Sequence, residues 1–265
     1  MRKKEEGMPS KQRRLLSDKR IFVAGGTGKI GTALIQACVL EGAKVVFSFM
    51  RSENRAREIY RTFGTLKPIQ LDIRDYTDVE RAKNLAISEL CDIDGIVNMA
   101  GIWKKENLDK AGLCDIRDVI DTNLMGSINI VRAFLPHFKE RKGGSIVLFG
   151  SSRINMEILS SSFYGASKMG IMGFMKALSS EISSYGIRIN VIAPGYILSG
   201  GRAEEIMANI PSCAPISLPF AHPRHVADVC SFLLSDMSCY ITGQFVEMDT
   251  RKIAPISSKK KDARS

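Results

Sequence analysis

Short apolar runs alternate with longer amphipathic stretches along most of the chain, and this alternation limits the possible folds more than any other feature. Each apolar run has the length and the β-branched content of a buried strand. The runs predict strands at Ile21–Ala24, Ala43–Phe49, Leu66–Leu71, Ile93–Asn98, Ser145–Phe149, Ile187–Ile192 and Gln244–Met248. Strands that alternate with helices of about ten or more residues form a parallel sheet with both faces covered. We therefore predict an α/β fold of three layers, with a mainly parallel sheet of about seven strands.

The amphipathic stretches have the length of ordinary helices. They predict helices from the turn after residue 24 to Glu41, over Asn54–Phe63, Thr77–Leu90, Ile116–Arg141 and Val226–Leu234, and in a long stretch that begins near Tyr164. Residues 200–221 show no clear period, and we interpret about 199–222 as a loop or lid. A chain of 265 residues suits a single domain with a substantial core.

The net charge of +10 is concentrated at the two ends of the chain. Residues 1–20 carry eight Lys and Arg against three Asp and Glu, and residues 251–265 carry six against one. We therefore expect basic flexible tails at 1–18 and 250–265 around a folded domain at 19–249. No aromatic residues interleave with the basic ones, so we do not expect nucleic acid as a partner.

Signals for a membrane, for secretion and for a metal are missing from the sequence. No apolar run approaches the roughly 18 residues of a membrane span, and the basic start of the chain lacks the apolar segment of a secretory signal. We expect a cytoplasmic protein that does not bind membranes. The six cysteines have no C-x-x-C spacing and resemble reduced core residues, so we predict no metal site.

A glycine-rich turn, Gly25-Gly-Thr27-Gly28-Lys29-Ile30-Gly31, follows the first predicted strand and opens the first predicted helix. Glycines there let the backbone approach a pyrophosphate, whose charge is favoured at the N-terminus of the helix. Such turns also connect strands to helices without binding anything. The position of this turn within a βαβ unit favours a dinucleotide, and hence a single-domain Rossmann-type fold.

The end of the second predicted strand distinguishes between the two nicotinamide dinucleotides. Proteins that bind NAD need an acidic side chain there for the ribose 2′-hydroxyl. This chain has Arg51 and Ser52, with no carboxylate before Glu53. Arginine binds a phosphate through paired donors, so we expect NADPH (NADP) rather than NADH. The other interpretation is that Arg51 only begins a solvated helix.

Tyr164 and Lys168 lie four residues apart at the start of a helical pattern, and therefore on one face of that helix. A lysine ammonium there lowers the pKa of the phenol from its usual value of about 10, which makes the phenol an acid or base near neutrality. Ser151, at the end of the fifth predicted strand, brings a hydroxyl to the same place. A Tyr–Lys pair at this spacing is also common by chance, so its meaning depends on the rest of the chain.

These motifs, in this order, resemble the short-chain dehydrogenase/reductase family over about Lys19 to Asp249. The resemblance also rests on Asp72, on Asn98-Met-Ala-Gly101, on Asn123 and on Asn190-Val-Ile-Ala-Pro-Gly195. It implies a catalytic tetrad of Asn123, Ser151, Tyr164 and Lys168. It also implies cofactor contacts from Gly25, Thr27, Gly28, Lys29, Ile30, Gly31, Arg51, Ser52, Asp72, Ile73, Asn98, Ala100, Gly101, Tyr164, Lys168, Pro194, Gly195, Ile197 and Ser199.

The family mechanism assigns a role to each member of the tetrad. By resemblance, Tyr164 gives a proton to the substrate carbonyl oxygen as hydride arrives from the nicotinamide, and Ser151 hydrogen-bonds that oxygen. Lys168 lowers the pKa of Tyr164 and binds the nicotinamide ribose. Asn123 holds a water that links Lys168 to solvent. These donors would stabilise the charge that develops on the carbonyl oxygen.

The chain departs from the family pattern at three places. Lys29 stands where the glycine turn usually has its middle glycine, Met99 replaces a usual Asn, and no Gly-Gly follows Asp249. Lys29 either adds a phosphate contact or crowds the pyrophosphate. The missing Gly-Gly bears on the C-terminal packing that accompanies the family tetramer.

Within the family, the stretch Cys239–Gln244 and the end of the second strand resemble those of 3-oxoacyl-[acyl-carrier-protein] reductases. We expect an NADPH-dependent reductase of a small or acyl-carrier-bound carbonyl substrate, working as a homotetramer or homodimer. Lys139, Arg141 and Lys142 either meet an acidic carrier protein or form a solvated helix end. The alternative is a dinucleotide-binding regulatory or structural subunit without turnover, against which the complete tetrad argues.

Overall fold

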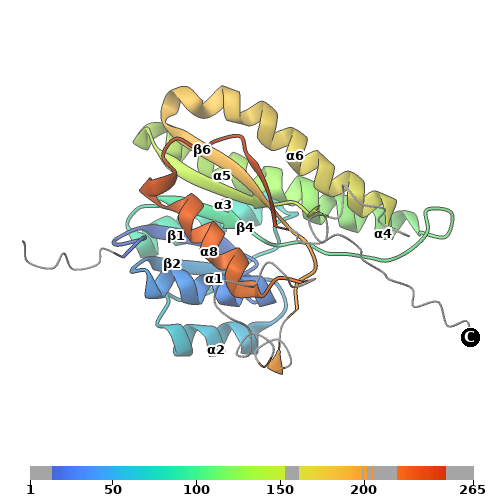
Figure 1. The fold of residues 1–265 in the computed structure, drawn as a ribbon, viewed down its shortest axis with the longest axis horizontal. Helices are drawn as coiled ribbons and strands as arrows, with labels where there is room; N and C mark the ends of the chain where they lie inside the picture. The colour runs from blue at the N-terminus through green and yellow to red at the C-terminus, as the bar shows by residue number, and fades with distance from the viewer. Residues whose placement is uncertain (1–13, 153–160, 199, 202–204, 206–219, 249–265) are drawn as a thin grey trace, which may run out of the picture.

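The computed structural model describes residues 14–152, 161–198, 200–201, 205 and 220–248. These residues form a seven-stranded sheet of order β3-β2-β1-β4-β5-β6-β7, in which every neighbouring pair is parallel (Figure 1). The strands are β1 (Arg20–Ala24), β2 (Lys44–Phe49), β3 (Ile69–Gln70), β4 (Gly95–Asn98), β5 (Gly144–Phe149), β6 (Ile187–Pro194) and β7 (Phe245–Met248). The predicted Rossmann-type α/β fold is confirmed.

Helices cover both faces of the sheet. They are α1 (Lys29–Leu40), α2 (Glu53–Phe63), α3 (Tyr76–Leu90), α4 (Leu113–Ile120), α5 (Gly126–Arg141), α6 (Ser162–Ile182) and α8 (Pro223–Leu234), with short helical turns η1 (Asp121–Met125), η3 (Ser183–Tyr185) and η5 (Asp236–Ser238). Side chains alternate along β1, so that Ile21 and Val23 pack with α1, α2 and α8, whereas Phe22 and Ala24 pack with α3, α5 and α6. The sheet therefore has a buried core on each side (Figure 1).

The strand order reverses between β1 and β4, and this reversal positions the site. The helix that follows β1 packs on one face of the sheet, whereas α5, which leads from β4 to β5, packs on the other. In open parallel sheets a ligand crevice lies at such a point, outside the carboxyl ends of the strands. The segments that follow Ala24, Asn98, Phe149 and Pro194 all lie at this edge.

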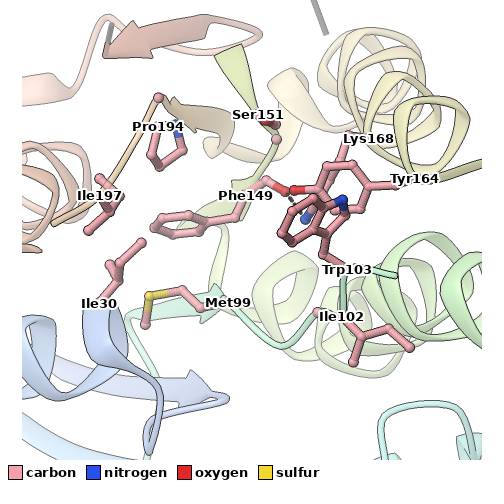
Figure 2. Close-up of a pocket in the computed structure, with 13 residues that line it drawn as sticks. Ile30, Met99, Ile102, Trp103, Phe149, Ser151, Tyr164, Lys168, Pro194 and Ile197 are labelled. Atoms are coloured by element: carbon pink, nitrogen blue, oxygen red, sulfur yellow. Dashed lines mark hydrogen bonds between the residues drawn. The ribbon is translucent and has the colours of Figure 1, made fainter. Parts of the chain in front are cut away.

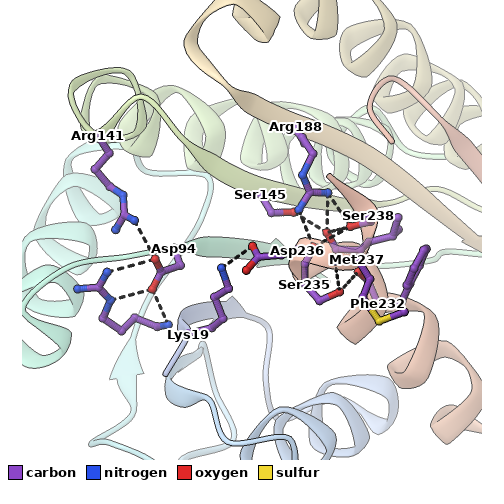
Figure 3. A network of polar contacts seen from close by, with 12 residues as sticks. Lys19, Asp94, Arg141, Ser145, Arg188, Phe232, Ser235, Asp236, Met237 and Ser238 are labelled. Atoms are coloured by element: carbon purple, nitrogen blue, oxygen red, sulfur yellow. Dashed lines mark hydrogen bonds and ion pairs between the residues drawn. The ribbon is translucent and has the colours of Figure 1, made fainter. Parts of the chain in front are cut away.

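The opposite edge, at the amino ends of the strands, carries a network of ion pairs (Figure 3). Arg20 Nε lies 2.7 Å from Asp94 Oδ2, and Arg20 Nη2 lies 2.8 Å from Asp92 Oδ2. Arg141, at the end of α5, pairs with the same two carboxylates and lies 2.8 Å from Asp94. Nearby, Arg188 of β6 donates to carbonyl and hydroxyl oxygens at the end of α8 and in η5. The network ties β1, β4 and α5 together.

The folded region begins earlier than the sequence predicts. Leu16 falls within the predicted tail 1–18, yet it is fully buried on the α1 side of the sheet, and its N–H donates to Glu41 O at 3.1 Å. The boundary at residue 18 is therefore wrong, because Leu16 belongs to the core. Residues 1–13 and 249–265, Ser199 and most of the predicted lid at 199–222 lie outside the described residues.

Two predicted elements are shorter or interrupted. The third strand, expected over Leu66–Leu71, forms a regular ladder with β2 only at Ile69–Gln70, while the N–H groups of Leu66 and Leu71 donate singly to β2. The helical pattern over Ile116–Arg141 is divided by η1, a π-helical turn that contains Asn123. Such turns widen a helix by one residue per turn and often occur at functional sites.

Candidate active site

Two cavities open at the carboxyl ends of the strands and share residues of the 99–103 segment, which follows β4. The Tyr164 cavity has a volume of about 300 Å³ and is lined by Ile30, Met99, Gly101, Ile102, Trp103, Phe149, Gly150, Ser151, Tyr164, Lys168, Pro194, Gly195 and Ile197. The Arg51 cavity has a volume of about 580 Å³, and the predicted residues in its wall are Gly25, Thr27, Gly28, Arg51, Ser52, Asp72, Ile73, Ala100 and Gly101. A ligand as long as a dinucleotide can therefore extend from one cavity into the other.

The glycine turn is closely packed at Gly25 and Gly31 and open at Gly28. Gly25 has a φ of +79°, and a Cβ there would lie 2.7 Å from Ala100 N, which leaves no room for any other residue. A Cβ on Gly31 would lie 2.6 Å from Gly25 O. At Gly28, the N-cap of α1, the nearest atom to such a Cβ is 3.6 Å away, so this side of the turn is open. The first N–H groups of α1 have no partner within the helix and are available to an anion.

Tyr164 and Lys168 of α6 meet Ser151, which follows β5, in one cavity (Figure 2). Lys168 Nζ lies 5.9 Å from the centre of the Tyr164 ring and donates to Phe149 O at 2.8 Å. Burial lowers the pKa of Lys168 from 10.5 to about 8. The amine is therefore still mostly protonated at neutral pH, and its charge favours the phenolate form of Tyr164.

Asn123 is fully buried in η1 and joins the 99–103 segment to α6. Its Oδ1 accepts from Ile102 N at 2.8 Å, and its Nδ2 donates to Ile102 O and to Ser167 Oγ, both at 3.0 Å. A Cβ on Gly101 would lie 3.0 Å from Asn123 Oδ1 and 3.5 Å from Lys168 Nζ. The amide and the amine therefore lie on either side of the same small space.

Asn98, the last residue of β4, is hydrogen-bonded through Ser127 to Asn123. Its Nδ2 donates to Ser127 Oγ at 3.0 Å, and that hydroxyl donates to Asn123 O at 2.6 Å. Its Oδ1 accepts from Ala100 N at 3.1 Å, which fixes the turn at the end of the strand. Because these groups are buried, losing one partner leaves another polar group unpaired, at a cost of about 1–3 kcal/mol.

The Arg51 cavity contains an arginine that is available to an anion. Among the described residues, no carboxylate pairs with Arg51. Asp72, in the same cavity, is instead held by Arg74, with Arg74 Nη2 2.7 Å from Asp72 Oδ2. The hydrogen bonds from Arg74 keep the pKa of Asp72 below its ordinary value, and Arg51 adds a weaker effect of the same sign. Asp72 is therefore neutralised by Arg74 and does not occupy Arg51.

Most of the predicted site residues line these two cavities, and five do not. Lys29 is exposed at the start of α1, where it lines neither cavity, and Gly31 packs beneath the turn. Asn98 and Asn123 act through the hydrogen bonds described above. Ser199 lies outside the described residues.

Comparison with known proteins decides the family. Residues 19–208 match the family described as short chain dehydrogenase, which covers most of the described domain. The chain is a short-chain dehydrogenase. It is thus an oxidoreductase that depends on a nicotinamide dinucleotide, and the resemblance seen in the sequence is confirmed.

Similar short-chain dehydrogenases come from several organisms. The 3-oxoacyl-[acyl-carrier-protein] reductase FabG of Salmonella typhimurium is 30% identical over 239 residues, which are 87% of this chain and 96% of that protein. The acetoacetyl-CoA reductase of a Synechocystis strain is 31% identical, over 88% of this chain and 96% of its own. Carbonyl reductase family member 4 of Xenopus laevis is 30% identical, over 86% and 94% of the two chains.

Several residues that line the cavities of this dehydrogenase were not found from the sequence, among them Trp103, Arg74 and Lys104. Trp103 lines both cavities, while Arg74 and Lys104 line the Arg51 cavity. Trp103 and Lys104 directly follow the Asn98–Gly101 motif at the carboxyl end of β4, which is the signal that would have found them. Arg74 carries a similar signal, because it directly follows the predicted residues Asp72 and Ile73, and it pairs with Asp72.

Neither a membrane helix nor a cluster of metal ligands occurs among the described residues of this dehydrogenase. None of its described helices is long and apolar enough to cross a bilayer. In the same part of the chain, no three His, Cys, Asp or Glu side chains gather as they would around a metal ion.

Proposed function

We propose that this dehydrogenase reduces the 3-oxo group of an acyl thioester with NADPH, and that Asn123, Ser151, Tyr164 and Lys168 form its catalytic tetrad. One observation carries the proposal: Tyr164, Lys168 and Ser151 line a single cavity that adjoins a second one containing the glycine turn and Arg51. A sensor that only binds a dinucleotide needs the second cavity and has no use for the tetrad.

The proposed roles follow from the charges and contacts of the chain. Bound NADPH supplies the hydride. Tyr164 gives its phenolic proton to the carbonyl oxygen as that oxygen gains charge, and Ser151 donates a hydrogen bond to it. The Lys168 ammonium, held by Phe149 O, stabilises the phenolate that remains. Asn123 keeps the backbone of Ile102 in place beside Lys168, where we propose that a water returns the proton.

The preference for NADPH is proposed from Arg51 and its surroundings. Arg51 and Ser52 follow β2 at the wall of the Arg51 cavity, where the ribose 2′-phosphate would lie. A charge-assisted pair between arginine and phosphate is among the stronger hydrogen-bonded contacts in proteins. The pairing of Asp72 with Arg74 supports this preference, because it reduces the repulsion between that carboxylate and the phosphate.

The thioester substrate is proposed from the relatives together with the cavity. Two of the relatives named above are reductases of 3-oxoacyl thioesters, one carried by a protein and one by coenzyme A. The structure gives no support for the use of Arg141 to bind a carrier protein. Arg141 is already paired with Asp92 and Asp94, and within one chain it lies at the amino-end edge of the sheet, opposite Tyr164.

We also propose that the protein is a homo-oligomer, either a tetramer or a dimer. Two apolar side chains, Met125 in η1 and Met169 in α6, are 43% and 42% exposed on elements that contact each other. We propose that they belong to the contact with a second copy. Light scattering after size-exclusion chromatography gives the mass directly, and a monomer at micromolar concentration would refute this proposal.

The reductase proposal is tested by following the absorbance of NADPH with acetoacetyl-acyl carrier protein and acetoacetyl-CoA as substrates. The wild type should turn over at least one of them, whereas Tyr164→Phe, which retains the ring and loses the proton, should be slower by about a hundredfold or more. Equal rates for the two proteins would refute the role of Tyr164. NADPH binding without turnover of either thioester would refute the substrate class.

The cofactor preference has its own test in Arg51→Ala. Loss of a charge-assisted contact of about 1.5–3 kcal/mol should weaken NADPH binding by about 10- to 150-fold and leave NADH binding unchanged. Arg55→Ala is the matched control, since Arg55 lies on α2 outside the cavity and pairs with Glu58. If Arg51→Ala weakens both cofactors equally, Arg51 does not recognise the 2′-phosphate.

A further inference from the structure

Trp103 is the largest side chain in the wall shared by the two cavities, and the mechanism proposed above does not use it. It follows β4 by five residues and lines the same cavity as Tyr164 (Figure 2). Of the described residues in that wall, the tetrad members and the predicted cofactor contacts leave Met99, Ile102, Trp103, Phe149 and Gly150 for the substrate.

The indole of Trp103 is fixed in place although it is 54% exposed. Its Nε1 donates to Ser161 Oγ at 3.0 Å, and that hydroxyl donates to Lys104 O at 2.8 Å. Ser161 is buried at the N-cap of α6, three residues before Tyr164. The ring is therefore oriented by the same helix that carries the tyrosine.

The backbone next to the indole is anchored on its other side. Lys104 Nζ lies 2.5 Å from Asp115 Oδ1 and 3.0 Å from Asp118 Oδ2, both of which belong to α4. Trp103 is thus held between α4 and α6, and a large aromatic ring has few rotatable bonds with which to move aside. In the cavity that contains Tyr164, a fixed flat ring would leave more room for an unbranched acyl chain than for one that is branched next to the reacting carbonyl.

We propose that Trp103 determines substrate specificity, by selecting acyl chains that are unbranched next to the reacting carbonyl over chains that carry a branch there. The inference rests on the proposed reduction of 3-oxoacyl thioesters and narrows its substrate class. Ser161 is the positioning residue, because it acts only through the indole.

The first test compares kcat/KM for two small probes, the acetoacetyl and 2-methylacetoacetyl thioesters of N-acetylcysteamine. Trp103→Ala should shift the ratio toward the branched probe by about tenfold or more, Trp103→Phe should shift it less, and Ser161→Ala should lie between the wild type and Trp103→Ala. Leu108→Ala is the matched control, since Leu108 is 62% exposed on the same loop and lines neither cavity; its ratio should equal that of the wild type. An unchanged ratio in Trp103→Ala would overturn the inference and leave the reductase function intact.

The second test does not depend on turnover. Trp103 is the single tryptophan of the chain, so all tryptophan emission reports this position. Adding the acetoacetyl thioester to protein saturated with NADP⁺ should change that emission, and Leu108→Ala should give the same change. A saturating thioester that leaves the emission unaltered would overturn the inference. An altered emission without turnover of either probe would support the contact with Trp103 and refute the proposed reduction.

Discussion

Replacing Lys168 with methionine should make the protein inactive and more stable at the same time. Lys168 is buried, and burial lowers its pKa from 10.5 to about 8. Each pKa unit corresponds to about 1.4 kcal/mol, so holding this ammonium inside the folded protein at pH 7 costs about 3 kcal/mol. Methionine has a similar length and no charge. It also removes the hydrogen bond to Phe149 O, a loss of about 1 kcal/mol. The net gain in the free energy of unfolding should be about 2 kcal/mol.

The pH dependence of this difference separates the charge from other effects of the substitution. Below pH 8 the amine is protonated in both the folded and the unfolded wild type, and the full cost of burial applies. Between pH 8 and pH 10.5 the folded protein has released this proton while the unfolded chain retains it, so wild-type stability rises relative to the variant. The two stabilities should nearly meet at about pH 9.5.

Urea unfolding of the wild type and Lys168→Met, without nucleotide, at pH 7 and at about pH 9.5 measures both quantities. The variant should also reduce ketones more slowly than the wild type by about a hundredfold or more. If the variant is less stable than the wild type at pH 7, burial of the Lys168 ammonium does not lower the stability of the folded protein. A stability difference that stays the same at both pH values would show that the gain does not come from the charge.

Two further substitutions test the glycine turn and the ion-pair network. Gly25→Ala should lower the free energy of unfolding by about 2 kcal/mol or more because of its positive φ and the close contact with Ala100 N, whereas Gly28→Ala, with no atom nearer than 3.6 Å, should stay within about 1 kcal/mol in the same urea experiment. Burial alone would raise the pKa of Asp94, but the hydrogen bonds and charge of Arg20 keep it below 3.8. Asp94→Asn should therefore cost about 1–3 kcal/mol at neutral pH. That difference should close as the pH falls below 3.8, through the folded-state pKa of Asp94, and a difference that persists in acid unfolding would contradict this origin.

The fold could be predicted because its elements are local. Strands such as β5 and β6 are continuous apolar runs, and the helices between the strands have clear periodicity. The order of the helices and strands and the parallel pairing of the strands could therefore be predicted from the sequence. The misplaced boundaries depend on contacts instead. Leu16 is buried because α1 and the loop at Glu41 lie next to it. The strand β3 is short because the regular ladder with β2 is limited to Ile69 and Gln70.

In the candidate site, too, residues placed by local pattern could be predicted, and residues placed by long-range contacts could not. Residues at strand ends and at fixed helical spacing, such as Ser151, Tyr164 and Lys168, converge as expected from their positions in the chain. The tie between Trp103 and Ser161 joins residues 58 positions apart, and no pattern in the sequence indicates it. The π-helical turn at Asn123 was equally hidden, because a helix with one extra residue keeps nearly the same periodicity.

The ion pairs at the amino ends of the strands bear on how such a sequence can diversify. The ion pairs among Arg20, Asp92, Asp94 and Arg141 connect β1, α5 and the start of β4, and none of these four residues lines either cavity. The ion pairs thus stabilise the fold at the amino ends of the strands, whereas the cavities lie at the carboxyl ends. Loops such as the one bearing Trp103 can change their sequence while these ion pairs remain intact, so substrate range can evolve with little loss of folding stability. For an engineer, the same division separates the positions to randomise from the positions to leave alone.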